Sequence, residues 1–424
     1  MLRLRRRPVL LLLSLALAAL LAPLSAHAAA PAFDAVAETE KLLATLPAEA
    51  RARSDAYFEG TYWLLLWNLV AALVAAGLLL VTGLAARIRN WAERVFKKRI
   101  LQVAACVLVL LALDAVIRLP LDYYEGYVRE HTYGLSNHTL GGWARDWLVG
   151  QIAGAVMTTP LLVLLYAVLR RWPLVWWSRA ALATPFLLVV LMAISPVFLA
   201  PLFNSYRPLA DASLREPILS LARANGIPAE NVWQFDASKQ TKRISANVSG
   251  ALGTTRIALN DNLLNRCTPA EIRAVMAHEM GHYVLNHTYK MAIFFGLVIA
   301  AGFAFTAWSI GFVLRRYGAA WGLRGLDDPA GLPLLTGLLA VYFFATTPVT
   351  KSIIRLQESE ADLFGLNAAR EPDGFATTAL KLGEYRKLAP GPLEEIIFFD
   401  HPSGRTRVLM AMRWKAEHPE LFTK

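Results

Sequence analysis

Residues 268–287 read TPAEIRAVMAHEMGHYVLNH, a stretch that combines a helix start with two histidines one helical turn apart. Thr268 can cap the helix, and Glu271 completes a capping-box pattern three residues later. His278 and His282 then lie on one face, so their imidazole nitrogens can bind a single Zn²⁺ ion. The sequence therefore predicts a metal-binding helix.

Glu279 directly follows the first of these histidines. A carboxylate there can take a proton from a zinc-activated water and later pass it to the leaving amine, so Glu279 is the predicted catalytic base. The pattern H-E-x-x-H also arises by chance, and a catalytic zinc site needs a third protein ligand. Residues 355–365, RLQESEADLFG, offer Glu358, Glu360 and Asp362 on a second predicted helix.

The composition is that of a multispanning membrane protein. Of 424 residues, 56% are hydrophobic and only 18% are charged, which exceeds ordinary globular usage. Lys and Arg form short clusters beside apolar runs, so bilayer topology explains the net charge of +11 better than nucleic-acid binding does. We therefore expect a lipid bilayer and a peptide or protein substrate as partners, and no nucleic acid. Six apolar runs have the length of a membrane-spanning helix, near residues 62–84, 100–119, 149–169, 180–203, 291–314 and 330–349.

Residues 1–28 have a basic start, an apolar centre and the small-residue site Ala26-His27-Ala28, which predicts a secretory signal peptide. An uncleaved first membrane anchor is the alternative, because the two kinds of segment differ mainly in apolar length and flanks. In both cases residues 29–61 form an extracytoplasmic N-terminal segment.

The apolar runs divide the rest of the chain into alternating parts. Residues 62–203 contain four predicted spans, and residues 204–290 form a polar segment with the histidine helix. Two more spans occupy 291–349, and the acidic helix belongs to a second polar segment, 350–424. Short runs with partial alternation in the first polar segment predict a small β-sheet. The predicted fold is mainly α: a multispanning helical membrane protein with a split zincin-like metalloprotease domain containing that sheet.

These motifs resemble those of the type I CAAX prenyl endopeptidases. Members of that family are integral-membrane zinc metalloproteases with the active site inside a large helical chamber. HEMGH at 278–282 and ESEAD at 358–362 stand where that family carries its zinc motifs, two membrane spans apart. The resemblance implies that Glu358 is the third zinc ligand, that Asp362 orients a zinc histidine, and that Glu360 is an ordinary neighbour. It covers nearly all of the chain and includes residues 127–146, 194–209 and 400–407.

The same resemblance implies roles for residues that would face the substrate. Asn247 would hold the substrate backbone along an edge strand, and His401 and Arg407 would lie near the zinc ion. An imidazole and a guanidinium there can stabilise a tetrahedral oxyanion, so both are predicted catalytic residues. His287 is interpreted as a helix-end residue, with support of the metal site as the alternative.

The sequence therefore predicts an integral-membrane zinc metalloendopeptidase with one Zn²⁺ ion per chain, and the resemblance implies cleavage of C-terminal tripeptides from prenylated CAAX proteins. The loops after the first, third and fifth runs are rich in Lys and Arg, so the positive-inside rule places them in the cytoplasm. The active site would then be extracytoplasmic, in the inner or plasma membrane of a bacterial-type cell. Membrane-associated or misfolded polypeptides are the expected substrates there.

Two other functional classes stay open on the sequence. A transporter or channel with a ligand-binding polar domain would account for Pro160, Pro185 and Pro196 inside the apolar runs. A zinc-stabilised membrane scaffold would share the metal, but it would not require Glu279 as a base.

Overall fold

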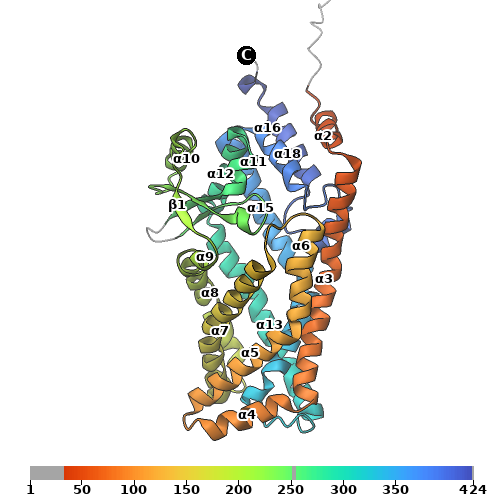
Figure 1. The fold of residues 1–424 in the computed structure, drawn as a ribbon, viewed down its shortest axis with the longest axis vertical. Coiled ribbons are helices and arrows are strands. Elements are labelled where there is room, and N and C mark those ends of the chain that lie inside the picture. Colours follow the sequence, from red (N-terminus) through yellow and green to blue (C-terminus); the bar gives the residue numbers. More distant parts are fainter. Residues whose placement is uncertain (1–32, 251–254, 423–424) are drawn as a thin grey trace, which may run out of the picture.

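The computed structural model describes residues 33–250 and 255–422. A bundle of long helices forms one end of the molecule, and the sheet lies with shorter helices at the other end (Figure 1). The predicted signal peptide or anchor at 1–28 lies outside the described residues.

The bundle consists of helices that are long and apolar enough to cross a membrane. Within the described residues there are five such helices, or six when one bent pair is counted as a span. In the most apolar stretch of each helix no more than 28% of the residues are buried inside the protein, which leaves apolar side chains for contact with lipid. The long helices are α3 (Ala48–Val81), α5 (Arg99–Tyr123, which continues through η1 and α6 to Thr132), α7 (Leu140–Arg171), α8 (Trp176–Ile194, which continues through η2 and α9 to Phe203) and α13 (His287–Tyr317).

The sixth apolar run does not form one straight helix. Helix α14 (Leu332–Ala345) and helix α15 (Thr347–Ala369) meet at a bend of 58°. Pro348 lies in the first turn of α15, and a proline disfavours helical geometry in the residue before it and has no N–H to donate. The acidic helix therefore follows the sixth run after a bend.

The predicted small sheet is confirmed, and it has four strands in the described part of the chain. Strand order is β1-β2-β4-β3, with β2 parallel to β4 and the other pairs antiparallel. In the described part of the chain β3 is an outer strand, and its Asn247 pairs in register with Ala258. The strands are β1 (Tyr206–Pro208), β2 (Val232–Phe235), β3 (Ala246–Ser249) and β4 (Arg256–Asn260).

The histidine helix, α12 (Pro269–Val284), begins as predicted. The Thr268 side chain accepts from the Glu271 backbone N–H, and the Glu271 carboxylate accepts from the Thr268 N–H at 2.7 Å, which completes the capping box. One face of α12 packs against the sheet through Met276 and Met280, which are fully buried. This packing holds the metal-binding face of the helix next to strand β3.

Helix α15 crosses α12 on its other side at close range. A Cβ added at Gly365 would lie 3.0 Å from the His278 backbone nitrogen, and one at Gly281 would lie 3.2 Å from the Ala361 Cα. Glycine at both positions therefore lets the two backbones approach each other. The remaining helices complete the polar end or flank the bundle: α2 (Ala35–Ala44), α4 (Leu84–Val95), α10 (Ala212–Ala224), α11 (Asp261–Arg266), α16 (Pro372–Leu382), α17 (Pro392–Phe398) and α18 (Gly404–Glu417).

Candidate metal centre and catalytic site

Helices α12 and α15 bring three metal-ligand side chains together. The Nε2 atoms of His278 and His282 lie 3.1 Å apart. Glu358 Oε2 lies 3.2 Å from His278 Nε2, and Oε1 lies 3.5 Å from His282 Nε2. One ligand atom from each residue lies within 4.8 Å of the others. Two imidazoles and one carboxylate are a common protein ligand set of catalytic zinc, with the fourth position left for water or substrate.

The contacts around His278 favour a cation at this cluster. Asp362 Oδ1 lies 2.8 Å from His278 Nδ1, which places a proton on Nδ1 and directs the Nε2 lone pair toward Glu358. Burial alone would lower the pKa of His278, but hydrogen bonds to Asp362 and Glu358 raise that pKa to about 10. The site therefore attracts positive charge at Nε2, and a divalent metal ion supplies such charge there.

Asp362 is itself held by Arg407 of helix α18. Arg407 Nε donates to Asp362 Oδ2 at 2.9 Å, and Nη2 donates to Oδ1 at 2.6 Å. Asp362 is 0% exposed, so this two-point pair neutralises a buried carboxylate. The predicted partner of a zinc histidine and the predicted substrate-facing arginine thus form one buried unit.

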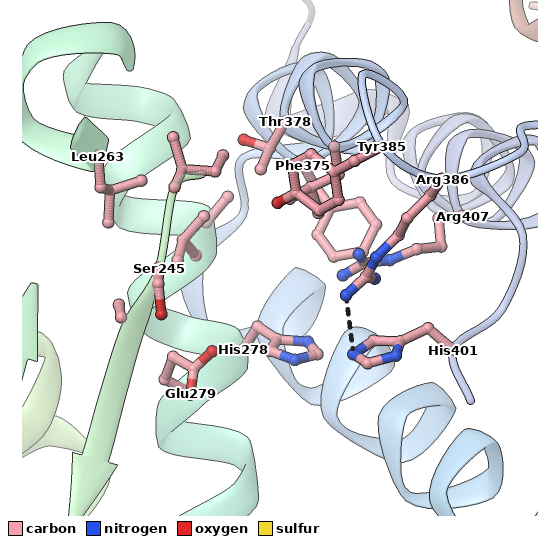
Figure 2. A pocket seen from close by; sticks show the side chains of 15 residues that line it. Ser245, Leu263, His278, Glu279, Phe375, Thr378, Tyr385, Arg386, His401 and Arg407 are labelled. Carbon is pink, nitrogen blue, oxygen red and sulfur yellow. Dashed lines mark hydrogen bonds between the residues drawn. The ribbon is translucent and has the colours of Figure 1, made fainter. Parts of the chain in front are cut away.

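Glu279 lies on the wall of a cavity of about 240 Å³ next to the three ligands. Figure 2 shows His278 and Glu279 on α12, with His401 and two arginines across from them. Ser245 and Ala246, at the start of β3, line the same cavity. Burial raises the pKa of the Glu279 carboxyl, and the nearby His278 and His282 oppose this effect. Such a carboxyl is a stronger base than one exposed to water.

His401 reaches the same cavity from the loop before α18. Its Nδ1 lies 2.7 Å from Asp400 Oδ1, and Asp400 Oδ2 lies 2.7 Å from Lys351 Nζ. Its Nε2 lies 3.2 Å from Glu358 Oε2 and 3.4 Å from Arg386 Nη2. Burial and the Arg386 guanidinium lower the pKa of His401, and the carboxylates of Asp400 and Glu358 oppose this effect.

Three of these supporting residues were not predicted from the sequence. Asp400 precedes His401 directly, so its proximity could have been noticed. Lys351 and Arg386 belong to no recognisable motif, and only the fold brings Lys351 to Asp400 and Arg386 to His401. Asn247 lies on β3 itself, where its Oδ1 accepts from Ser249 Oγ at 3.1 Å.

Glu360 lies on α15 but points away from the three ligands. Its Oε2 lies 3.0 Å from His287 Nε2 and 2.7 Å from Lys290 Nζ. His287 in turn lies against His282, with 2.8 Å between their Nδ1 atoms. A third histidine five residues after HEMGH is the signal for this contact in the sequence, although its position alone favours a helix end.

Comparisons with known proteins match both parts of the chain. Residues 208–415 match peptidase family M48, and residues 34–205 match the CAAX prenyl protease N-terminal region of five membrane helices. The metalloprotease YhfN of Bacillus subtilis is 33% identical over 332 residues, which cover 78% of this chain and 78% of that protein. The chain belongs to peptidase family M48. CAAX prenyl protease 1 of Saccharomyces cerevisiae is 35% identical to this M48 chain over 193 residues, 45% of this chain and 42% of the yeast protein.

The fold is shared with a solved structure. The crystal structure of Saccharomyces mikatae Ste24p superposes with a TM-score of 0.73 at 23% identity, over 89% of this chain and 94% of that chain. The predicted family and enzyme class are therefore confirmed, and the chain is an integral multi-pass membrane metalloprotease with a His-His-Glu metal site. The transporter and scaffold hypotheses lose their support.

Proposed function

We propose that this M48 metalloprotease is a zinc endopeptidase that holds one Zn²⁺ ion per chain and hydrolyses peptide bonds of membrane-associated or misfolded polypeptides. The observation that carries the proposal is the convergence of His278, His282 and Glu358. His278 and the adjacent Glu279 line a cavity that Ala246 of the outer strand β3 also lines. Metal, base and a surface for an extended chain are the three parts that peptide hydrolysis requires.

His278, His282 and Glu358 would hold the zinc ion. When bound, zinc polarises the scissile carbonyl and makes a water molecule acidic enough to lose its proton near neutral pH. Glu279 takes that proton and then delivers it to the leaving amine. The buried position of Glu279 favours proton uptake, because burial raises the pKa of its carboxyl.

Strand β3 would bind the substrate backbone. An extended peptide can pair with the free backbone groups of an outer strand, and the cavity with Glu279 begins beside the first residue of β3. Asn247 would add a side-chain hydrogen bond to the substrate backbone. The scissile bond is thereby placed beside the metal ligands.

His401 and Arg407 would stabilise the oxyanion. Both line the cavity with His278 and Glu279. Asp400 orients the His401 ring, and Arg407 keeps its charge while it binds Asp362. Arg386 lies in the same wall and adds a second guanidinium. In a cavity of low dielectric, positive potential stabilises the transition state more than the ground state, because the negative charge on the oxygen appears only in the transition state.

We place the active site on the extracytoplasmic face. Helix α4 follows the first span and lies at the end of the bundle opposite α12 and the sheet (Figure 1). Arginines and lysines gather in and just after α4 and in the last turns of α7 and α13. The positive-inside rule assigns that end to the cytoplasm. Prenylated proteins on the cytosolic side are the second candidate substrate, supported by the relatives named CAAX prenyl protease 1.

The test of catalysis is Glu279→Gln, measured on purified protein with a quenched fluorescent peptide and by metal analysis. The amide fills the space of the carboxylate but cannot take a proton, so we expect retained zinc and hydrolysis slowed by about 10²–10⁴-fold. Unchanged hydrolysis in the variant would remove Glu279 from the mechanism.

The test of sidedness places single cysteines at Asn90 and Ser213 in a variant whose Cys106 and Cys267 are replaced by serine. Intact cells are treated with a membrane-impermeant thiol reagent. We expect labelling at residue 213 and not at residue 90, with both labelled after lysis. The reverse pattern would make the prenylated substrate the leading candidate.

A further inference from the structure

His287 connects a metal ligand to the surface through a chain of polar contacts. It is only 3% exposed, and its Nδ1 lies 2.8 Å from His282 Nδ1. Its other nitrogen, Nε2, lies 3.0 Å from Glu360 Oε2, and Lys290 Nζ lies 2.7 Å from the same oxygen. The side chains of Glu360 and Lys290 are 51% and 41% exposed, so the chain of contacts ends in solvent.

The break between α12 and α13 makes this contact possible. In a continuous helix, residues five apart do not share a face, so position 287 would point away from position 282. Asn286 adopts the left-handed conformation, with φ 58° and ψ 35°, and α13 starts at the next residue. Asparagine tolerates this conformation better than most residues do. The turn at Asn286 brings the His287 ring back against His282.

The contacts allow one arrangement of protons. An ionised Glu360 next to Lys290 can only accept, so the hydrogen of a neutral His287 lies on Nε2. Nδ1 of His287 then carries a lone pair and accepts from the Nδ1–H of His282. The His282 Nε2 atom is left with its lone pair directed at His278 and Glu358. The opposite arrangement would point an N–H group of His282 at the metal position and would prevent ligation.

We propose that His287 is the positioning residue of the second metal histidine, with Glu360 fixing its tautomer and Lys290 holding Glu360. This inference rests on the proposed zinc function. It assigns a separate support to each histidine: Asp362 of α15 lies against His278, with 2.8 Å between Oδ1 and Nδ1, and His287 of α13 accepts from His282. Hydrogen bonds of this kind orient the ligand ring and raise its basicity, and their loss typically costs about 10–100-fold in metal affinity.

The test compares His287→Leu with His287→Gln in otherwise intact, full-length protein. Leucine fills the buried space but offers no polar atom, whereas the glutamine amide offers one acceptor for His282 and one donor for Glu360. We expect His287→Leu to lose zinc to a competing chelator about 10–100-fold more readily than the wild type, and His287→Gln to recover most of that loss. His418→Leu is the matched control, because His418 stacks on Trp414 at the end of α18.

Two further measurements separate positioning from loss of fold. Glu360→Leu changes a half-exposed side chain, and we expect it to weaken zinc retention in the same direction by a smaller factor. The Co²⁺-loaded protein should show an altered visible absorption spectrum in His287→Leu and a spectrum close to the wild type in His287→Gln.

Equal zinc retention in folded His287→Leu and wild-type protein would overturn the inference, as would a glutamine variant no better than the leucine variant. A wild-type protein that binds no zinc would overturn the proposed function instead, so the two failures are distinguishable.

Discussion

Helices α12 and α15 together supply the ligands of one metal site, but different features of the sequence and fold determine where each helix begins and lies. Helix α12 has its own capping box, and its two histidines and base follow one another within five residues. Helix α15 begins after a 58° bend, and among the described residues no side chain caps its first turn. Local sequence therefore defines α12, whereas the place of α15 depends on what it packs against.

The largest expected effect tests the single ligand that α15 contributes. Glu358→Ala should lose most of the bound zinc and all measurable hydrolysis, because a three-ligand site depends on each ligand. Metal analysis after gel filtration measures this loss. Glu216→Ala, an exposed carboxylate of α10 paired with Arg215, is the control and should keep its zinc. Stoichiometric zinc in Glu358→Ala would mean that α15 ligates through another residue.

The next effect concerns the buried pair that joins α15 to α18. Asp362→Asn keeps the shape of the side chain but leaves the Arg407 guanidinium without its counter-charge in the interior. We expect a loss of about 3–5 kcal/mol of stability, because a buried charge without its partner is strongly destabilising. Thermal unfolding in detergent checks this value. A melting temperature equal to the wild type would show that water or another group reaches Arg407.

A smaller loss of stability is expected from a change at the close crossing of α12 and α15. In Gly365→Ala the new Cβ would lie 3.0 Å from the His278 backbone nitrogen, and backbone atoms cannot move aside cheaply. We expect a destabilisation of about 1–3 kcal/mol together with weaker zinc binding, as for overpacked cores. Gly77→Ala in α3 is the control, since a Cβ there meets no atom within 4 Å in the described part of the chain. Equal melting temperatures for Gly365→Ala and the wild type would contradict the close crossing.

The smallest effect tests the independence of α12. Glu271→Gln weakens the bond to the Thr268 N–H and removes the ion pair with Lys381, at 2.7 and 2.6 Å. We expect a loss of about 1–2 kcal/mol in stability at pH 7 with the zinc site intact. The Lys381 and Thr268 contacts outweigh burial and lower the pKa of Glu271.

The same substitution has a defined pH dependence. Because the folded-state pKa of Glu271 is lowered, its contribution is fully present above the ordinary carboxyl pKa and disappears as pH falls through the lowered value. The stability difference between wild type and Glu271→Gln should therefore shrink below about pH 4. A constant difference from pH 7 to pH 3 would contradict the role of the charge.

The parts of the fold and of the site that could be predicted from the sequence are those specified by short local motifs. The capping box and HEMGH are local patterns whose geometry follows from 3.6 residues per turn, so the start of α12 and the convergence of its histidines could be derived from the sequence. The resemblance to the CAAX prenyl endopeptidases selected Glu358 from three nearby acids. Strand β1 could not be predicted from the sequence, because three residues, one of them a proline, carry little periodicity.

The supporting contacts show what the sequence alone leaves open. Glu360 and Asp362 are both acids on α15, yet Asp362 lies against His278 while Glu360 lies against His287. The bend before α15 and the glycine at 365 set the rotation and approach of that helix relative to α12. The sequence by itself determined the helices, the ligands on α12 and the membrane character, because these depend on short-range periodicity and composition. Only the tertiary structure decided which acid meets which histidine, because that depends on the rotation of α15 relative to α12 and α13, whose histidines lie about 70–85 residues earlier in the chain.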